Sequence, residues 1–322
     1  MYEPMYFRVL LILFCIFLLG CTEQAQTPLR IGTNTWPGYE PLYVTQKKYP
    51  EFQTQIKFVE YRNASQVLNG IINNSIDVAA VTLDEAVKIK TLGYDIQVVW
   101  VIDESFGADA LMSLHYDSIL ELKGKKIGVE TSALGAYFLK RFLEINQLKK
   151  SDFEIVNLEV NRHYSAVIEE QVDAVLTFDP VKSKLLAAGA ANLFDSTQIP
   201  GEIVDVLIVN RYDFNANQQA VLSAFLAANS KTVAAINHNI TPYFHSLNNR
   251  LNLPEAQFYA SYQQLHLFEL DKVTDWYAQV DTQKQLVKRF SSVLKEEQIT
   301  SQDCDCDDLI SSVILDMVRN EK

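Results

Sequence analysis

Two pairs of similar segments divide most of this chain into halves that repeat one pattern. LRIGTNTWPGYEPLYV is similar to KKIGVETSALGAYFLK, and SIDVAAVTLDEAVKIK is similar to QVDAVLTFDPVKSKLL. Gly32 and Gly128 occupy equivalent positions 96 residues apart, and Thr82 and Thr177 lie 95 residues apart. Because both pairs keep nearly the same spacing, we interpret the similarity as a repeated structural unit.

Each half contains two junctions at which a β-rich stretch leads into a helix. Strands rich in Val and Ile that alternate with helices favour parallel sheets covered on both faces, so each half is predicted to form an α/β lobe. Thr82 and Glu85 have the spacing of a capping box, and Thr131 stands in a similar capping position. In open α/β sheets, ligands bind beyond the carboxyl ends of the strands. The four junctions therefore predict a binding cleft between two lobes.

Two stretches have the pattern of connections between the lobes. VVWVIDESFGADALMSL is typical of a strand, a turn at Gly107 and a second strand, and IPGEIVDVLIVN is typical of a turn followed by a strand. We therefore predict that lobe 1 contains residues 29–106 and 201–322, and that lobe 2 contains residues 107–200. The chain after Asn215 has a mostly helical pattern and is expected to complete lobe 1. A chain of 322 residues is long enough for two hydrophobic cores.

The first 20 residues have the features of a secretory signal peptide. An arginine precedes an apolar run over residues 9–20 that is too short for a comfortable membrane span, which is the alternative interpretation. The sequence LLGC, ending at Cys21, resembles the lipobox of bacterial lipoproteins. We therefore predict a signal peptide over residues 1–20, lipidation of Cys21 and a polar tether over residues 21–28. The protein is then a membrane-anchored lipoprotein on the periplasmic side of the cell envelope, and Thr22 favours the outer membrane.

Charge and cysteine content exclude some kinds of partner. The chain contains 28 Lys and Arg against 40 Asp and Glu, and its net charge of -12 disfavours nucleic acid, which requires a basic surface. Beyond the signal and the lipobox, only Cys304 and Cys306 remain, in the acidic stretch SQDCDCDD. One intervening residue makes a strained disulfide loop, and the stretch offers too few nitrogen or sulfur ligands for a metal. We interpret it as a solvated turn rather than a metal or redox site, and note that an exported thiol pair can be oxidised.

The motifs together resemble those of a known family. The segments IGTNTWPGYEPLYV, NGIINNSIDVAAVTLDEA, GADALMSL, LKGKKIGVETSALGAYFL, DAVLTFDPV and LFDSTQIPGEIVDVLIV closely resemble the periplasmic substrate-binding proteins of ABC transporters. The most similar branch includes binders of aliphatic sulfonates, taurine, nitrate and thiamine pyrimidine precursors. The resemblance covers residues 29–320 and implies a type II periplasmic binding protein fold, an α/β fold with two lobes and two hinge crossovers. It also implies that the lobes close over a small molecule and present it to an ABC permease, or alternatively to a membrane signalling protein.

Carried over residue by residue, the resemblance implies a set of ligand-binding residues at the junctions and hinges. From lobe 1 these are Asn34, Thr35, Trp36, Tyr39, Thr82 and Asp84. From lobe 2 they are Glu130, Thr131, Ser132, Thr177 and Asp179, with Ser105 and Asp109 near one hinge and Glu202 near the other. Trp36 and Tyr39 offer a flat apolar wall for a ring or an alkyl chain. As alternatives, the Trp36 indole packs on its own lobe, Asp84 and Glu85 are solvated charges of a first helical turn, and Asp179 only caps a helix.

The charges at the junctions bear on the ligand. Helix amides and hydroxyls can hold an anion, but uncompensated carboxylates would weaken its binding, so we favour a neutral or amine-bearing organic solute. The five histidines lack metal-ligand spacing, and no hydrolase, phosphate-loop or dinucleotide-binding motif occurs. Enzymes of this fold need a nucleophilic cysteine or a reactive histidine at the cleft. We therefore expect no enzyme activity, no metal and no cofactor. The junction carboxylates that would weaken the binding of an anion are Glu40, Asp84, Asp103, Asp109, Glu130, Asp179 and Glu202.

Overall fold

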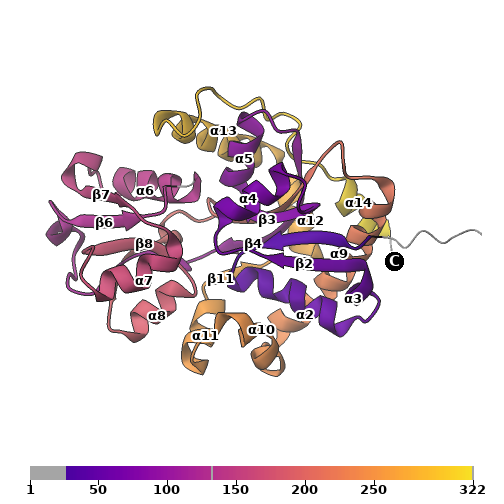
Figure 1. Ribbon diagram of the computed structural model, residues 1–322, viewed down its shortest axis with the longest axis horizontal. Coiled ribbons are helices and arrows are strands. Elements are labelled where there is room, and N and C mark those ends of the chain that lie inside the picture. Colours follow the sequence, from indigo (N-terminus) through magenta and orange to yellow (C-terminus); the bar gives the residue numbers. More distant parts are fainter. Residues whose placement is uncertain (1–26, 132, 321–322) are drawn as a thin grey trace, which may run out of the picture.

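The computed structural model describes residues 27–131 and 133–320, and their strands form two sheets (Figure 1). One sheet has six strands in the order β11-β4-β10-β3-β1-β2, and the other has five in the order β7-β6-β8-β5-β9. We call the six-stranded sheet with its helices lobe 1, and the five-stranded sheet with its helices lobe 2. Lobe 2 lies at the left of Figure 1 and lobe 1 at the right. The prediction of two α/β lobes is confirmed.

The strands of lobe 1 are β1 (Leu29–Thr33), β2 (Ile56–Glu60), β3 (Val78–Thr82), β4 (Ile96–Ser105), β10 (Val204–Asn210) and β11 (Leu265–Leu267). Those of lobe 2 are β5 (Asp109–Ser113), β6 (Lys126–Val129), β7 (Glu154–Asn157), β8 (Ala174–Phe178) and β9 (Ala191–Asp195). All five residues of β3 are buried, because helices cover both faces of the sheet at its centre.

The helices of lobe 1 are α2 (Glu40–Lys48), α3 (Phe52–Gln55), α4 (Ala64–Ile72), α5 (Leu83–Thr91), α9 (Ala216–His238), α10 (Phe244–Leu251), α11 (Glu255–Tyr262), α12 (Leu270–Ala278), α13 (Val280–Glu296) and α14 (Val313–Asn320). Those of lobe 2 are α6 (Ala133–Ile145), α7 (Val160–Ile168) and α8 (Val181–Ala187). Short 3-10 turns are η1 (Pro37–Tyr39), η2 (Ile119–Leu122), η3 (Lys150–Asp152), η4 (Ser196–Gln198) and η5 (Thr241–Tyr243). Within residues 27–131 and 133–320, every helix is too short or too polar to cross a membrane.

The repeated sequence pattern corresponds to a repeated topology. β1 pairs in parallel with β2 and β3, and β6 pairs in parallel with β7 and β8. The next strand in each sheet is antiparallel, β10 beside β3 in lobe 1 and β5 beside β8 in lobe 2. The prediction of parallel sheets is therefore wrong for these strands. The reason is topological, because β5 and β10 each follow a crossing from the other lobe and enter their sheet in the opposite direction.

The two connections between the lobes are hydrogen-bonded to each other. The chain leaves lobe 1 between β4 and β5 and returns between β9 and β10. The hydroxyl of Ser196, in the second connection, lies 2.8 Å from Ser105 Oγ and accepts a bond from Gly107 N at 2.6 Å. Gly107 has a φ of 110°, a conformation that favours glycine. The lobe boundaries at 106/107 and 200/201 stay predictions.

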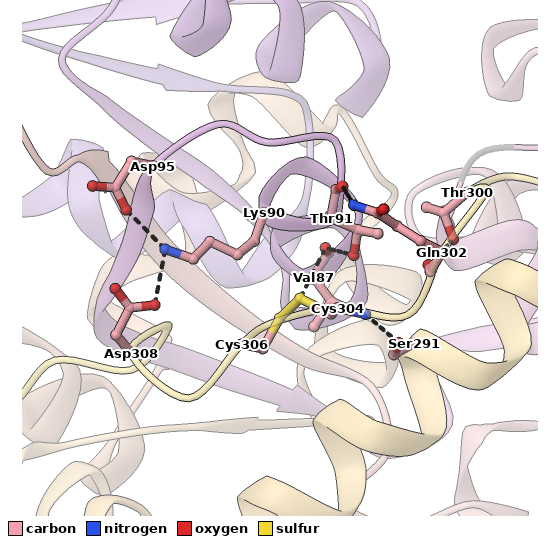
Figure 2. The surroundings of a disulfide bond; sticks show 10 residues. All are labelled: Val87, Lys90, Thr91, Asp95, Ser291, Thr300, Gln302, Cys304, Cys306 and Asp308. Carbon is pink, nitrogen blue, oxygen red and sulfur yellow. Dashed lines mark hydrogen bonds and ion pairs between the residues drawn. A yellow bond between two sulfur atoms is a disulfide. The ribbon is translucent and has the colours of Figure 1, made fainter.

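The C-terminal segment after α13 contains a disulfide and is held to the rest of lobe 1 by hydrogen bonds and ion pairs (Figure 2). Cys304 and Cys306 form a disulfide, which corrects the interpretation of SQDCDCDD as only a solvated turn, and both pack against the lobe 1 core. Cys304 N donates to Ser291 Oγ of α13 at 2.8 Å. Asp308 lies 2.9 Å from Lys90 Nζ of α5. These contacts hold the segment that carries the disulfide against α13 and α5.

Candidate ligand-binding site

A cavity lies between the two lobes and is lined by residues of both. The space between the lining residues, counted with the open solvent at its mouth, is about 660 Å³. Both lobes contribute junction loops to its walls, and the antiparallel strands β5 and β10 contribute its floor. Seven of the predicted site residues line it: Asn34, Trp36, Tyr39, Thr82, Asp109, Glu130 and Thr177.

The loop after β1 places two aromatic side chains at the cavity. Trp36 Nε1 donates to the Asp103 carboxylate at 3.3 and 3.4 Å, and the indole meets Phe178 of lobe 2 edge-on, with ring centroids 5.8 Å apart. The indole therefore packs on its own lobe and also faces the other lobe. A Cβ on Gly38 would lie 1.9 Å from Asp103 Oδ2, so only glycine allows the carboxylate this approach. Tyr39 donates its hydroxyl hydrogen to Asp205 Oδ1.

The junction between β3 and α5 buries two carboxyl groups. Thr82 N donates to Glu85 Oε2 at 3.1 Å, which is the predicted capping contact. Glu85 lines the cavity and is 2% exposed, and Asp84 beside it is 1% exposed. The alternative that Asp84 and Glu85 are solvated is therefore wrong. Burial raises the pKa of both carboxyl groups, and Asp84 raises that of Glu85 further.

The corresponding junctions of lobe 2 face lobe 1 across the cavity. Ser65 Oγ of α4 donates to Glu130 Oε1 at 3.4 Å, which joins the two lobes at the cavity wall. Thr177 ends β8 and lines the cavity. Asp179 lies behind it, fully buried, and its Oδ1 accepts from Ser183 N at 2.9 Å at the start of α8. Asp179 therefore caps a helix, while its other oxygen has no hydrogen-bond partner among the described residues.

The first hinge contributes a carboxyl group to the cavity floor. Asp109 is 2% exposed, and its backbone N donates to Ser105 Oγ at 3.2 Å. Burial raises the pKa of Asp109 to about 7, although a hydrogen bond to Ser105 and the charge of Lys182 oppose the shift. Lys182, on α8, is itself completely buried and donates to Gly107 O and to Gln264 Oε1 of lobe 1.

Six of the predicted residues do not line the cavity. Thr131 is exposed, and its N donates to Asn157 Oδ1 at 3.2 Å. Glu202 accepts hydrogen bonds from Arg141 Nε at 2.7 Å and from Arg289 Nη1 at 2.8 Å, so it joins α6 of lobe 2 to α13 of lobe 1. Ser132 lies outside the described residues, as does Cys21. The six are Thr35, Asp84, Ser105, Thr131, Asp179 and Glu202.

Sequence reasoning missed several residues of the cavity. Asp205 projects from β10 and is the one charged residue in the stretch IVDVLIV, which is an informative signal because a carboxyl group is costly to bury in a central strand. Phe178 follows Thr177 in the recognised junction, and a search for aromatic residues there would have found it. Phe138 and Leu134 come from the first turns of α6, where the sequence gives no signal beyond helical periodicity.

One histidine, which the sequence analysis did not assign to the site, lies at the cavity. His163 on α7 is completely buried, and its Nε2 lies 3.0 Å from Leu158 O. Burial lowers its pKa to about 4, so the ring is neutral near pH 7. Neither described cysteine lines the cavity, and the described residues contain no group of three or more His, Cys, Asp and Glu side chains arranged to hold a metal ion.

Solved structures with the same fold include several periplasmic binding proteins. The aliphatic sulphonate binding protein SsuA from Escherichia coli is 20% identical, with a TM-score of 0.69 over 89% of this chain and 92% of its own. The ligand-binding component of an ABC-type import system from Staphylococcus aureus, with zinc bound, is 14% identical, with a TM-score of 0.74 over 90% and 98%. The Candida albicans CA3427 gene product, described as having the generic periplasmic binding protein fold, is 14% identical, with a TM-score of 0.65 over 91% and 95%.

At these identities the similarity concerns the fold, and it confirms the predicted periplasmic binding protein fold. No curated protein matches the chain by sequence. The family model described as "NMT1/THI5 like" matches residues 36–239, which is more than half of the chain. The chain therefore belongs to the NMT1/THI5-like family.

Proposed function

We propose that this chain is an extracytoplasmic solute-binding protein that captures a small organic molecule between its lobes and delivers it to an ABC permease. The observation that carries the proposal is the cavity, whose walls come from both lobes. A ligand that contacts both lobes only when they are closed shifts the population towards the closed form, which the permease can recognise. The family match, and the solved structures described as periplasmic or import-system binding proteins, support this function.

The cavity lining favours a neutral or amine-bearing organic solute over an anion. Trp36, Phe138 and Phe178 supply aromatic walls suited to a ring or an alkyl chain. Among the described residues, no lysine or arginine lines the cavity, whereas Glu85 and Asp205 line it. A sulfonate or nitrate there would meet carboxyl groups without a compensating cation.

The remaining parts of the proposal concern location and chemistry. The lipidated Cys21 would hold the protein at the periplasmic side of the envelope, and the tether over residues 21–28 would raise its effective concentration near a membrane partner.

We infer binding rather than catalysis, because the neutral ring of His163 is buried and its Nε2 is engaged by a main-chain carbonyl. Neighbouring permease and ATPase genes would support transport, whereas a membrane signalling enzyme without them would support sensing.

A ligand screen with a matched pair of variants tests the proposal. The melting temperature of the full chain is measured with amines, heterocycles, alcohols, sulfonates and oxyanions, since a ligand that binds only the folded state raises it. Trp36→Phe should weaken binding of the solute found and reduce its fluorescence response. Trp276→Phe, on α12 and outside the cavity, is the control and should do neither. A panel in which nothing raises the melting temperature contradicts the proposed function.

A further inference from the structure

Six carboxyl groups are buried around the cavity, each on a residue at most 3% exposed. Three of them, Glu85, Asp109 and Asp205, line the cavity itself. The other three lie directly behind these, one beside Glu85, one bound to the Trp36 indole and one at the start of α8. They come from both lobes and from the hinge strands β4 and β10. The three behind the cavity wall are Asp84, Asp103 and Asp179.

The positive charge near this carboxyl cluster is small. Lys182 is the only lysine or arginine in the described chain that is almost fully buried, and its Nζ is already engaged by Gly107 O and Gln264 Oε1. Lys88 of α5 also acts on the cluster, but Glu104 of β4 and Glu130 before α6 add negative charge. Six buried negative charges facing one buried cation would be very unfavourable, so most of these carboxyl groups hold a proton while the closed cavity is empty.

Several polar atoms around the cavity are available for hydrogen bonds to a ligand. Among the described residues, eight buried side-chain atoms lack a hydrogen-bond partner, and five belong to the junctions around the cavity. Three of these belong to residues that line it: Asp109 Oδ2 and Thr177 Oγ1 from lobe 2, and Thr82 Oγ1 from lobe 1, which also lies at the capping box of α5. Buried polar atoms are rarely left without partners, and once Asp109 is ionised, its oxygen and the hydroxyl oxygens can accept hydrogen bonds from a group with several N–H bonds.

We propose that the cavity binds a small organic cation, a protonated amine on an aromatic or alkyl body, and that the carboxyl cluster releases a proton to solvent when the cation enters. The proposal rests on the proposed function, since it names the ligand class of the same site. The amine stays protonated, a carboxylic acid becomes a carboxylate, and the charge of the closed site is unchanged. A neutral isostere gains no ion pair, and an anion would have to enter beside acids that cannot compensate it.

Proton release fixes the direction of the pH dependence. If one proton leaves for each cation bound, the affinity rises by about tenfold for each pH unit while the cluster is protonated. The rise ends once the relevant carboxyl group is ionised in the empty protein. The pKa of Asp109, raised by burial to about 7, puts the end of the rise near pH 7. Throughout the rise, protons compete with the cation for the site.

Isothermal titration calorimetry on the full chain tests the exchange. The probes are matched sets of an amine, the corresponding alcohol and the corresponding sulfonate, on benzyl, pyridylmethyl, pyrimidinylmethyl and butyl bodies. Titrations in phosphate and in citrate, neither of which is an amine or a sulfonate and which differ in ionisation enthalpy, count the protons released. We expect an amine to be the tightest ligand of its set, with an affinity about tenfold higher at pH 6.5 than at pH 5.5 and an enthalpy that differs between the buffers.

Two variants separate the contribution of charge at the site from that of hydrogen bonding. Asp109→Asn should weaken amine binding and reduce the number of protons released. Thr177→Val should weaken amine binding while leaving proton release intact, because it removes an acceptor but no acid. Melting curves confirm that each variant is folded. Binding of an alcohol or sulfonate as the tightest ligand, or of an amine without proton release, overturns the inference while the proposed function stands; a panel in which nothing binds contradicts both.

Discussion

Replacing Asp109 by asparagine should stabilise the empty protein at pH 8, although it removes a residue of the proposed site. Asp109 is almost fully buried, and burial raises its pKa to about 7 from an ordinary value of 3.8. A raised carboxyl pKa means that the folded protein prefers the protonated form. The contribution of Asp109 to folding stability is therefore fully present well below the unfolded pKa of 3.8, and it is lost as the pH rises through the folded pKa of about 7. A shift of about three pH units corresponds to about 4 kcal/mol at pH 8, which asparagine would not lose.

Urea unfolding of both proteins at pH 4 and pH 8, without ligand, measures this difference. The stability gain of Asp109→Asn should reach several kcal/mol at pH 8 and fall below about 1 kcal/mol at pH 4, where the aspartate of the unfolded chain is only partly ionised. Asp117→Asn is the control, because Asp117 is an exposed residue of lobe 2 and its substitution changes the net charge equally. An Asp109→Asn protein that is no more stable than the wild type at pH 8, or equally stabilised at pH 4, refutes the reasoning.

Three further predictions concern the contacts outside the cavity. Glu202→Gln weakens the ion pairs that join α6 to α13, so it should lower ligand affinity about tenfold and increase the radius of gyration of the empty protein in small-angle scattering. Glu144→Gln, at an exposed residue of α6, should change neither quantity. Joint replacement of Cys304 and Cys306 by serine should cost about 1–2 kcal/mol in calorimetry, because the loop is short, and leave affinity unchanged. Cys21→Ser should move the protein from the membrane fraction to the soluble fraction; continued sedimentation with membranes contradicts lipidation.

The sequence predicted the local parts of this fold well, because each depends on a few neighbouring residues. The strand-to-helix junctions around Gly32 and Gly128 are visible as repeats, and they form equivalent positions in the two sheets. The antiparallel direction of β5 and β10 was not predicted, since a strand's hydrophobic pattern does not depend on its direction. Only the path of the chain between the lobes decides it.

The candidate site was predicted less completely for a similar reason. Thr82 and Thr177 were found because they end strands, and the end of a strand is a local feature. Asp205 enters the cavity from the start of β10, just after the return crossing, and its neighbours there include Tyr39, 166 positions away. Glu202 lies close to the hinge in sequence, but Arg141 and Arg289 draw its side chain to the outer face between α6 and α13. Pairings over such separations cannot be inferred from one sequence.

Because the buried acids lie at the hinge, the proposed exchange of a proton for a cation also affects how readily the two lobes close. In an open form, water would solvate the carboxylates that Asp103, Asp109 and Asp205 present, and their ionisation would cost little. Closing the empty cleft removes that water, so the acids must either take up protons or remain charged in a medium of low polarity. A cation bound between the lobes removes this cost. The same groups that select the ligand would therefore disfavour closure without it, and the empty protein should become more open as the pH rises from 6 to 8.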